Sequence, residues 1–295
     1  MTQSFGLRPF LLALAVVAVW GTNFVIIRVG LDALPPLLFA ALRFTLAALP
    51  LVFFLKRPAV PWRDLAAYGV LIGVGQFGLL FIAIDGFIAP GLASLVVQTQ
   101  VVFTIALAMR GTSERPAPVQ WAALLLAVAG LAVILGHTGG TTTPFGVALV
   151  IGAAFSWSLG NMVQRRAGRV DMLAFVVWSS LFAVPPLFAL AFLFEGAPAI
   201  AQALGAAGPG VWAVVAWQAV GNTMFGYGAW GWLLARYPAA SVAPMSLLVP
   251  VFGMGAAALW LAEPLPGWKL VAAALIIGGL AVNLFGPQLL RRRMV

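Results

Sequence analysis

Residues 96–103 read VVQTQVVF and place two amides, Gln98 and Gln100, inside an apolar stretch that carries no charge. Amide side chains offer hydrogen bonds but no nucleophile or acid, so the chemistry they predict is the binding of a polar ligand. A polar group left unpaired in hydrocarbon costs several kcal/mol. Each amide is therefore expected either to bond to a neighbouring helix or to face a cavity.

The two amides have different surroundings if this stretch is an α-helix. At about 100° per residue, positions two apart point about 200° away from each other. Ser94 shares the face of Gln98, and Thr104 shares the face of Gln100. We favour a cavity for Gln98 and a bond to a neighbouring helix for Gln100, and we keep both as candidate ligand contacts.

Similar polar residues lie in the middle of other apolar stretches. Trp20 and Trp157 are each followed within four residues by an asparagine, and the two indoles suit a flat or apolar ligand held from two sides. For each amide and hydroxyl the alternative is an interhelical bond, worth roughly 0.6–2 kcal/mol. The predicted ligand contacts are Trp20, Asn23, Gln76, Gln98, Gln100, Trp157, Asn161, Gln218, Asn222, Tyr227 and Ser246. The same stretches also hold Ser156, Ser179, Ser180 and Thr223.

Arg43 is the one ionisable residue clearly inside an apolar stretch. Such residues are functional candidates, because burying a charge is costly. Pairing with Asp32 or Asp85, bonding to helix-terminal carbonyls and binding a ligand carboxylate are all open, and we favour a structural role. Glu114 and Glu263 fall just beyond apolar stretches and are expected in loops or helix caps. No carboxylate is clearly placed in the middle of a stretch.

Motifs for catalysis are missing from the sequence. It has no His-Glu-x-x-His, Gly-x-Ser-x-Gly or P-loop pattern and no paired aspartates within an apolar stretch. Because there is no cysteine, disulfides and thiolate metal sites are excluded. We therefore expect no enzyme activity, no cofactor and no metal.

The elements that must position these residues follow from the composition. Of the 295 residues, 63% are hydrophobic and 8% are charged, with a mean hydropathy of +1.08, whereas globular proteins have roughly 25% charged residues. About 20 apolar residues in a helix cross a hydrocarbon core of about 30 Å. The chain is predicted to be an all-α polytopic membrane protein embedded in a lipid bilayer. Its ten predicted transmembrane helices cover roughly 10–30, 34–55, 65–84, 91–109, 117–136, 144–164, 171–194, 211–234, 239–261 and 267–288.

The basic residues gather in alternate loops between these helices. With the N-terminus in the cytoplasm, 13 of the 16 Lys and Arg residues lie on the cytoplasmic side. The positive-inside rule therefore predicts that both termini are cytoplasmic. Nucleic-acid binding is not expected despite the net charge of +9, because the charges are spread over six short segments.

The two halves of the chain resemble each other. Trp20 and Arg28 recur 137 positions later as Trp157 and Arg165, and a later set of residues recurs after 149 positions. We explain the growing offset by a longer loop around residues 195–210. The predicted repeats are residues 10–136 and 144–288, each of five helices. Since five is odd, the second repeat must be inverted, which places a central cavity between the halves.

The fifth and tenth helices contain almost no polar side chains and are expected to form scaffold or a helix-packing interface. Small residues four apart would let neighbouring backbones approach closely. The pairs of this kind are Ala123 with Ala127, and Ala274 with Gly278.

Several motifs together resemble one transporter family. They include Trp20-Gly21-Thr22-Asn23, Gly91-Leu92-Ala93-Ser94 with Gln98 and Gln100, Phe155-Ser156-Trp157 with Gly160-Asn161, Gly226-Tyr227-Gly228 with Trp230, and Val242-Ala243-Pro244 with Ser246. The chain resembles EamA-type members of the drug/metabolite transporter superfamily over residues 10–288, and among them the bacterial exporters of amino acids and related metabolites. The resemblance implies ten helices in two inverted repeats, a central cavity and alternating access.

The sequence thus predicts an exporter of neutral amino acids, including aromatic ones, in the bacterial inner membrane. A mostly neutral cavity wall would bind a zwitterion and release it readily. The alternatives are an exporter of cationic drugs, disfavoured by the lack of a carboxylate at mid-membrane, and a membrane scaffold that transports nothing. The coupling ion and the oligomeric state are left open.

Overall fold

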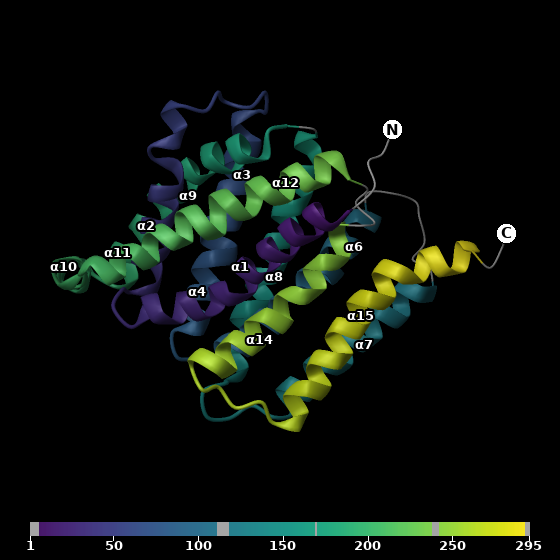
Figure 1. Cartoon of the computed structure of the whole chain (residues 1–295). Coiled ribbons are helices and arrows are strands. Elements are labelled where there is room, and N and C mark those ends of the chain that lie inside the picture. Colours follow the sequence, from purple (N-terminus) through teal and green to yellow (C-terminus); the bar gives the residue numbers. More distant parts are fainter. Residues whose placement is uncertain (1–5, 111–117, 169, 238–241, 293–295) are drawn as a thin grey trace.

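The computed structural model describes residues 6–110, 118–168, 170–237 and 242–292, and within these ranges all regular structure is helical. The predicted all-α class is therefore confirmed. Figure 1 shows a bundle of long helices running in roughly the same oblique direction. The helices of the first half are α1 (Leu7–Leu31), α2 (Pro36–Ala48), η1 (Leu51–Phe53), α3 (Trp62–Val70), η2 (Leu71–Gly78), α4 (Leu79–Ile84), α5 (Pro90–Val96), η3 (Val97–Thr99), α6 (Gln100–Arg110) and α7 (Pro118–Leu135).

The second half begins at α8. Its helices are α8 (Pro144–Ala167), α9 (Met172–Phe194), α10 (Ala197–Ala206), α11 (Pro209–Ala216), η4 (Trp217–Phe225), α12 (Gly226–Arg236), η5 (Ala243–Leu248), α14 (Val249–Trp260) and α15 (Gly267–Arg292). Prolines stand in the first turn of many of these helices, where the missing N–H costs no hydrogen bond.

Several helices are long and apolar enough to cross a membrane. In the described part of the chain five helices meet this criterion alone, and a sixth is added if the bent pair formed by Ala197–Ala206 and Pro209–Leu233 counts as one span. Shorter apolar helices cover Trp121–Leu135, Met245–Trp260 and Gly267–Val282. The chain is thus a multi-pass membrane protein.

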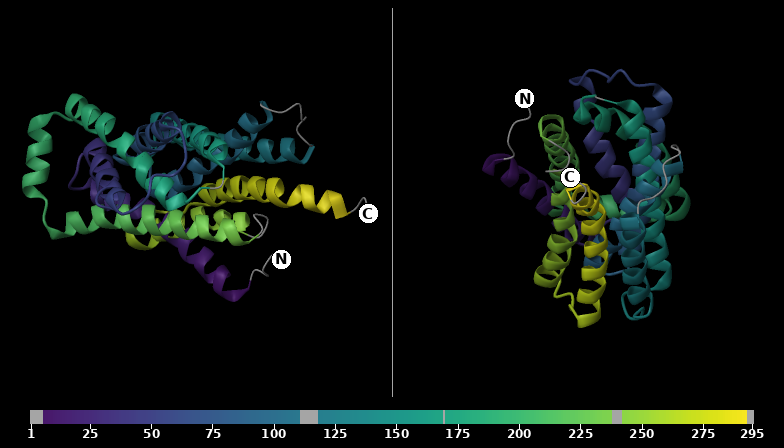
Figure 2. Two further views of the ribbon diagram at one scale, coloured as in Figure 1. Left: turned by 90° about the horizontal axis from the view of Figure 1, so that it is seen from above. Right: turned by 90° about the vertical axis from the view of Figure 1, so that its right-hand side faces the viewer.

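The segment expected to be a long loop around residues 195–210 contains a helix, so that expectation is wrong. α10 occupies Ala197–Ala206 and meets the next helix at an angle of 105°. Its sequence APAIAQALGA is rich in alanine, the strongest helix former, and it begins with a proline in the first turn. Figure 2 shows α10 as a short piece across one end of the bundle.

Four irregular segments interrupt the long helices. η2 and η4 are π-helical, and they lie in the third and eighth apolar stretches of the chain. η3 and η5 are 3₁₀-helical, and they lie in the fourth and ninth. π-helical turns are rare and are frequent at functional sites. Four of the stretches with polar residues therefore also depart from α-helical geometry, whereas α1 and α8 are regular α-helices.

α7 and α15 pack side by side as a pair, as expected for scaffold helices (Figure 1). A side chain on Gly279 would meet the carbonyl oxygen of Ala123 at 2.8 Å and the nitrogen of Ala127 at 3.3 Å, so the predicted small pair of α7 lies at the contact. The predicted pair on α15 does not, since Ala274 is exposed and nothing approaches Gly278. The face of α15 that contacts α7 contains Gly279, whereas Ala274 and Gly278 lie on a different face of the helix.

The start of α1 and the end of α15 lie at the same end of the bundle (Figures 1 and 2). The ends of α6 and α12 lie there as well, and the links from α4 to α5 and from α14 to α15 lie at the opposite end (Figure 1).

Candidate functional site

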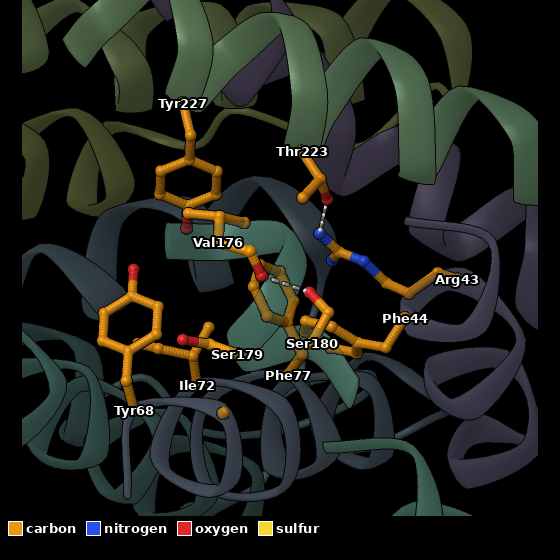
Figure 3. Close-up of a pocket in the computed structure, with 11 residues that line it drawn as sticks. Arg43, Phe44, Tyr68, Ile72, Phe77, Val176, Ser179, Ser180, Thr223 and Tyr227 are labelled. Carbon is orange, nitrogen blue, oxygen red and sulfur yellow. Dashed lines mark hydrogen bonds between the residues drawn. The ribbon is translucent and has the colours of Figure 1, made fainter. Parts of the chain in front are cut away.

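A small pocket opens between helices of the two halves of the chain (Figure 3). Its walls come from α2, α3 and η2 on one side and from α9, η4 and α12 on the other. The enclosed space is about 10 Å³, about the room that one water molecule needs, so a larger solute requires the surrounding helices to move apart. Its lining residues are Arg43, Phe44, Tyr68, Gly69, Ile72, Phe77, Val176, Ser179, Ser180, Thr223 and Tyr227.

Arg43 is the only charged residue of this lining and is fully buried, at 0% exposure. Its Nη2 donates a hydrogen bond of 2.8 Å to Oγ1 of Thr223, while Nε and Nη1 have no hydrogen-bond partner. The guanidinium carbon lies 3.7 Å from the centroid of the Phe77 ring. A cation–π contact contributes about 0.5–2 kcal/mol, whereas burying an ion costs several kcal/mol. These contacts therefore leave the charge only partly compensated.

The pairing of Arg43 with Asp32 or Asp85, one of the options raised by the sequence, is wrong. Both carboxylates lie at the far ends of their helices and contact Arg28, at 2.6 Å and 3.8 Å respectively. Arg43 lies in the middle of α2 and donates its hydrogen bond to Thr223 instead.

Trp20, Asn222 and Tyr227 come together where α1 meets the eighth apolar stretch. Trp20 Nε1 donates a hydrogen bond of 3.3 Å to the Asn222 carbonyl oxygen, and its ring lies 5.6 Å from Tyr227 and 5.2 Å from Trp230, measured between centroids. A side chain at Gly226 would collide with the indole, so glycine is required for this close approach. Trp20 therefore joins the two halves of the chain beside the pocket, and Tyr227 lines the pocket itself.

The two glutamines of the VVQTQVVF stretch have different partners, as their spacing predicted. Gln100 Oε1 accepts hydrogen bonds from Asn161 Nδ2 at 3.1 Å and from Thr104 Oγ1 at 3.4 Å. Gln98 Nε2 donates to the Ser246 carbonyl oxygen at 3.2 Å. An α-helix would point the two side chains about 200° apart, which is about 160° measured the shorter way round. Because η3 is a 3₁₀-helix with about three residues per turn, the angle between them is instead about 120°. Gln100 ties α6 to α8, the role we favoured for it.

Three other predicted contacts are buried amides with atoms that lack a hydrogen-bond partner. These atoms are Asn23 Oδ1, Gln76 Oε1, and both Oε1 and Nε2 of Gln218. Gln76 and Gln218 lie on the two π-helical segments. Trp157 is half-buried and packs against the apolar core. Of the eleven predicted contacts only Tyr227 lines the pocket, and the other ten lie outside its lining.

The pocket is also lined by residues that were not among the predicted contacts: Tyr68, Ser179, Ser180 and Thr223. The last three stood out only as polar residues in apolar stretches. Tyr68 gave no signal, because a tyrosine seven residues into an apolar helix fits the membrane interface equally well. Ser179 Oγ is buried without a partner, whereas Ser180 Oγ donates to the Val176 carbonyl oxygen at 2.8 Å.

The described carboxylates all lie at helix ends. Glu263 accepts hydrogen bonds from the Gly91 N–H at 2.9 Å and from Lys269 Nζ at 2.8 Å, which confirms its predicted role as a cap. Its counterpart Glu114 lies outside the described residues. Glu195 caps the N-terminus of α2 through two backbone N–H groups. Burial raises the pKa of Glu195, and these hydrogen bonds oppose the shift. Burial also raises the pKa of Asp85, against the opposing charge of Arg28.

The fold and site define a multi-pass membrane protein with a buried pocket between its halves. A sequence model described as the EamA-like transporter family matches residues 7–136 and 144–285. The chain belongs to this family, which indicates a transporter rather than an enzyme.

Two curated relatives resemble nearly the whole chain. A protein of Salmonella typhimurium named "Probable amino-acid metabolite efflux pump" is 43% identical over 96% of this chain and 97% of its own length. A protein of Escherichia coli with the same name is 41% identical over 93% and 94%. A solved structure, titled only as the crystal structure of a protein, has a TM-score of 0.62 at 22% identity and covers 93% of this chain and 96% of its own. This last likeness concerns the fold alone.

Proposed function

We propose that this protein exports neutral amino acids, including aromatic ones, across the bacterial inner membrane by alternating access. The observation that carries the proposal is the identity of 43% over nearly the full length to a probable amino-acid metabolite efflux pump. The pocket between the halves supports it, because its aromatic and hydroxyl lining suits a small amphiphilic solute.

The chain is proposed to cross the membrane ten times, as two inverted repeats of five helices. The family model matches each half separately, and the irregular segments support the same division. η2 and η4 are both π-helical, and η3 and η5 are both 3₁₀-helical. Each pair falls in corresponding stretches of the two halves. Substrate sites of inverted-repeat transporters lie near the bilayer midplane between the repeats, which suits the position of this pocket.

Both termini are proposed to be cytoplasmic. The start of α1 and the end of α15 lie at one end of the bundle (Figure 1), as an even number of crossings requires. Because the chain has no cysteine, single cysteines can be introduced without background. Arg57→Cys and Gly139→Cys place a thiol at exposed positions in loops of opposite predicted sides. A membrane-impermeant maleimide should label only Gly139→Cys in intact spheroplasts and only Arg57→Cys in inside-out vesicles. The reverse pattern would overturn the orientation.

The transport proposal is tested with purified protein in proteoliposomes. Flux of radiolabelled phenylalanine, cysteine and threonine is compared with flux of a quaternary ammonium compound. Saturable amino-acid flux that is absent from protein-free liposomes is expected. Transport of the quaternary ammonium alone would instead identify a cation exporter, and the absence of any flux in well-folded protein would favour the scaffold alternative.

Amino-acid substitutions test whether the predicted contact residues take part in transport. Trp157→Ala, Gln98→Ala and Tyr227→Ala are expected to reduce amino-acid flux, because Tyr227 lines the pocket and Trp157 and Gln98 are predicted ligand contacts. Leu125→Ala, on a side chain of α7 that is 67% exposed, is the control and should leave flux unchanged. Equal flux in all four variants would remove these contacts from the site.

The cationic-drug alternative is disfavoured by the charge of the pocket. Its only charged lining residue is an arginine, and the carboxylates of the described residues lie at helix ends. A permanent cation in this pocket would meet a like charge in a medium of low dielectric constant.

A further inference from the structure

We infer that Arg43 binds the carboxylate of the transported substrate, so that the pocket selects solutes with a free carboxylate group. The inference rests on the proposed transport of amino acids and specifies which end of the substrate the pocket recognises. It departs from the structural role that the sequence alone favoured, and three observations about the described residues carry it.

The first observation is that no carboxylate among the described residues serves as a counterion to Arg43. Every described carboxylate is engaged elsewhere: Asp32 and Asp85 by Arg28, Asp64 by Arg63, Asp171 by the Ala174 N–H, Glu195 by the N–H groups of Leu37 and Leu38, and Glu263 by Lys269 and Gly91. A buried arginine in a membrane protein normally has a partner, since an isolated charge is costly there. A carboxylate on the substrate would supply the missing partner.

The second observation is that the guanidinium is fixed in place yet has donors to spare. Thr223 Oγ1 accepts from Arg43 Nη2 and itself donates to the Gln218 carbonyl oxygen at 3.0 Å, so the hydroxyl is oriented before any ligand arrives. The ring of Phe77 covers one face of the guanidinium. The N–H groups on Nε and Nη1 lie in the guanidinium plane without a protein partner. Such groups form short, directional bonds to carboxylate oxygens.

The third observation is the surroundings of these donors. Arg43 and Thr223 stand at one side of the pocket, and Tyr68 and Tyr227 stand at the other with their hydroxyl ends directed toward each other (Figure 3). Ser179 Oγ is buried there without a partner. When the helices move apart to admit a solute, as alternating access requires, this lining offers a cation and a free hydroxyl to a polar head group, and aromatic rings to an apolar side chain. This arrangement matches a solute with a carboxylate at one end.

The first test uses the unmodified protein and needs no variant. Uptake of radiolabelled phenylalanine into proteoliposomes is competed with unlabelled phenylalanine, phenylalaninamide and 3-phenylpropionate. We expect 3-phenylpropionate, which keeps the carboxylate but lacks the amine, to compete, and phenylalaninamide to compete at least about tenfold less well. Equal competition by phenylalaninamide and phenylalanine would overturn the role of Arg43.

The second test changes the residue. Arg43→Gln should reduce the apparent affinity for phenylalanine about tenfold or more while leaving that for phenylalaninamide nearly unchanged, a split that a merely structural residue would not produce. Arg43→Lys keeps the charge without the planar fork and should keep part of the preference. Arg28→Gln, at a solvent-exposed ion pair, is the control for charge removal. If Arg43→Gln does not fold, the competition panel and Arg43→Lys still decide.

The two proposals fail in different ways. If the parent protein moves no amino acid, the proposed function is wrong. If it moves phenylalanine but phenylalaninamide competes equally, or if Arg43→Gln weakens both ligands alike, amino-acid transport stands and the inference about Arg43 is wrong.

Discussion

The buried ion pair between Glu263 and Lys269 gives the sharpest prediction about stability. The two side chains are 8% and 7% exposed, and their charged atoms lie 2.8 Å apart. Glu263 also caps the first turn of α5 at Gly91. α5 continues into η3, which carries Gln98, so this pair fixes the helix that positions a predicted ligand contact. Removing one partner leaves the other charge buried and unpaired.

Lys269→Met should therefore destabilise the protein by about 3–5 kcal/mol, the usual cost of breaking a buried pair. At about 2–4 °C per kcal/mol for chains of this order of size, the apparent melting temperature in detergent should fall by about 6–20 °C. Glu263→Gln should be similarly damaging. The double variant should recover part of the loss, because neither charge is then left alone.

The control is the solvent-exposed ion pair between Arg28 and Asp32, in which the Asp32 side chain is 63% exposed. Asp32→Asn should cost at most about 1 kcal/mol. Thermal unfolding of all variants at one scan rate provides the comparison. A melting temperature for Lys269→Met within about 1 °C of the parent, or strictly additive effects in the double variant, would refute the reasoning.

Three further predictions follow from other contacts. Gln100→Leu and Asn161→Leu should show a coupling of roughly 0.6–2 kcal/mol in a double-mutant cycle of thermal unfolding, the worth of an interhelical hydrogen bond, and full additivity would contradict that bond. Gly279→Ala should destabilise by about 1–3 kcal/mol because the new methyl group meets the backbone of α7, whereas Gly278→Ala should not; equal melting temperatures would exclude this packing face. The raised pKa of Glu195 means that this carboxyl group binds its proton more tightly in the folded protein than in the unfolded chain. The contribution of Glu195 to stability should therefore decline as pH rises through the raised pKa. Glu195→Gln should remove this pH dependence from a series of melting curves.

Much of the fold could be predicted from the sequence because the bilayer imposes a simple rule. A run of about 20 apolar residues has to be a helix, since backbone groups in hydrocarbon must bond within the segment. The apolar windows therefore correspond to the observed helices to within a few residues. α10 was not predicted, because it lies across the end of the bundle and is shorter than the apolar run that a membrane-spanning helix needs. The π and 3₁₀ turns could not be predicted, because their hydrogen-bond pattern depends on packing partners that no local sequence pattern encodes.

The candidate site was harder to predict, because it depends on which faces of distant helices meet. Arg43 and Thr223 are separated by 180 positions, and Trp20 and Asn222 by 202. The sequence could identify polar residues in apolar stretches, and it favoured an interhelical bond for Gln100, but it could not show which residues line the pocket. That none of the described carboxylates pairs with Arg43 became visible only once Asp32 and Asp85 were placed at Arg28.

The central claim is that the protein carries amino acids through a site that faces the two sides of the membrane in turn. Counterflow tests this claim most directly: proteoliposomes loaded with unlabelled phenylalanine are diluted into a trace of radiolabelled phenylalanine. Alternating access predicts that the label accumulates transiently above its equilibrium level inside the vesicles, because exchange of the bound substrate outpaces net flow. Accumulation no greater than in liposomes without protein would contradict the account.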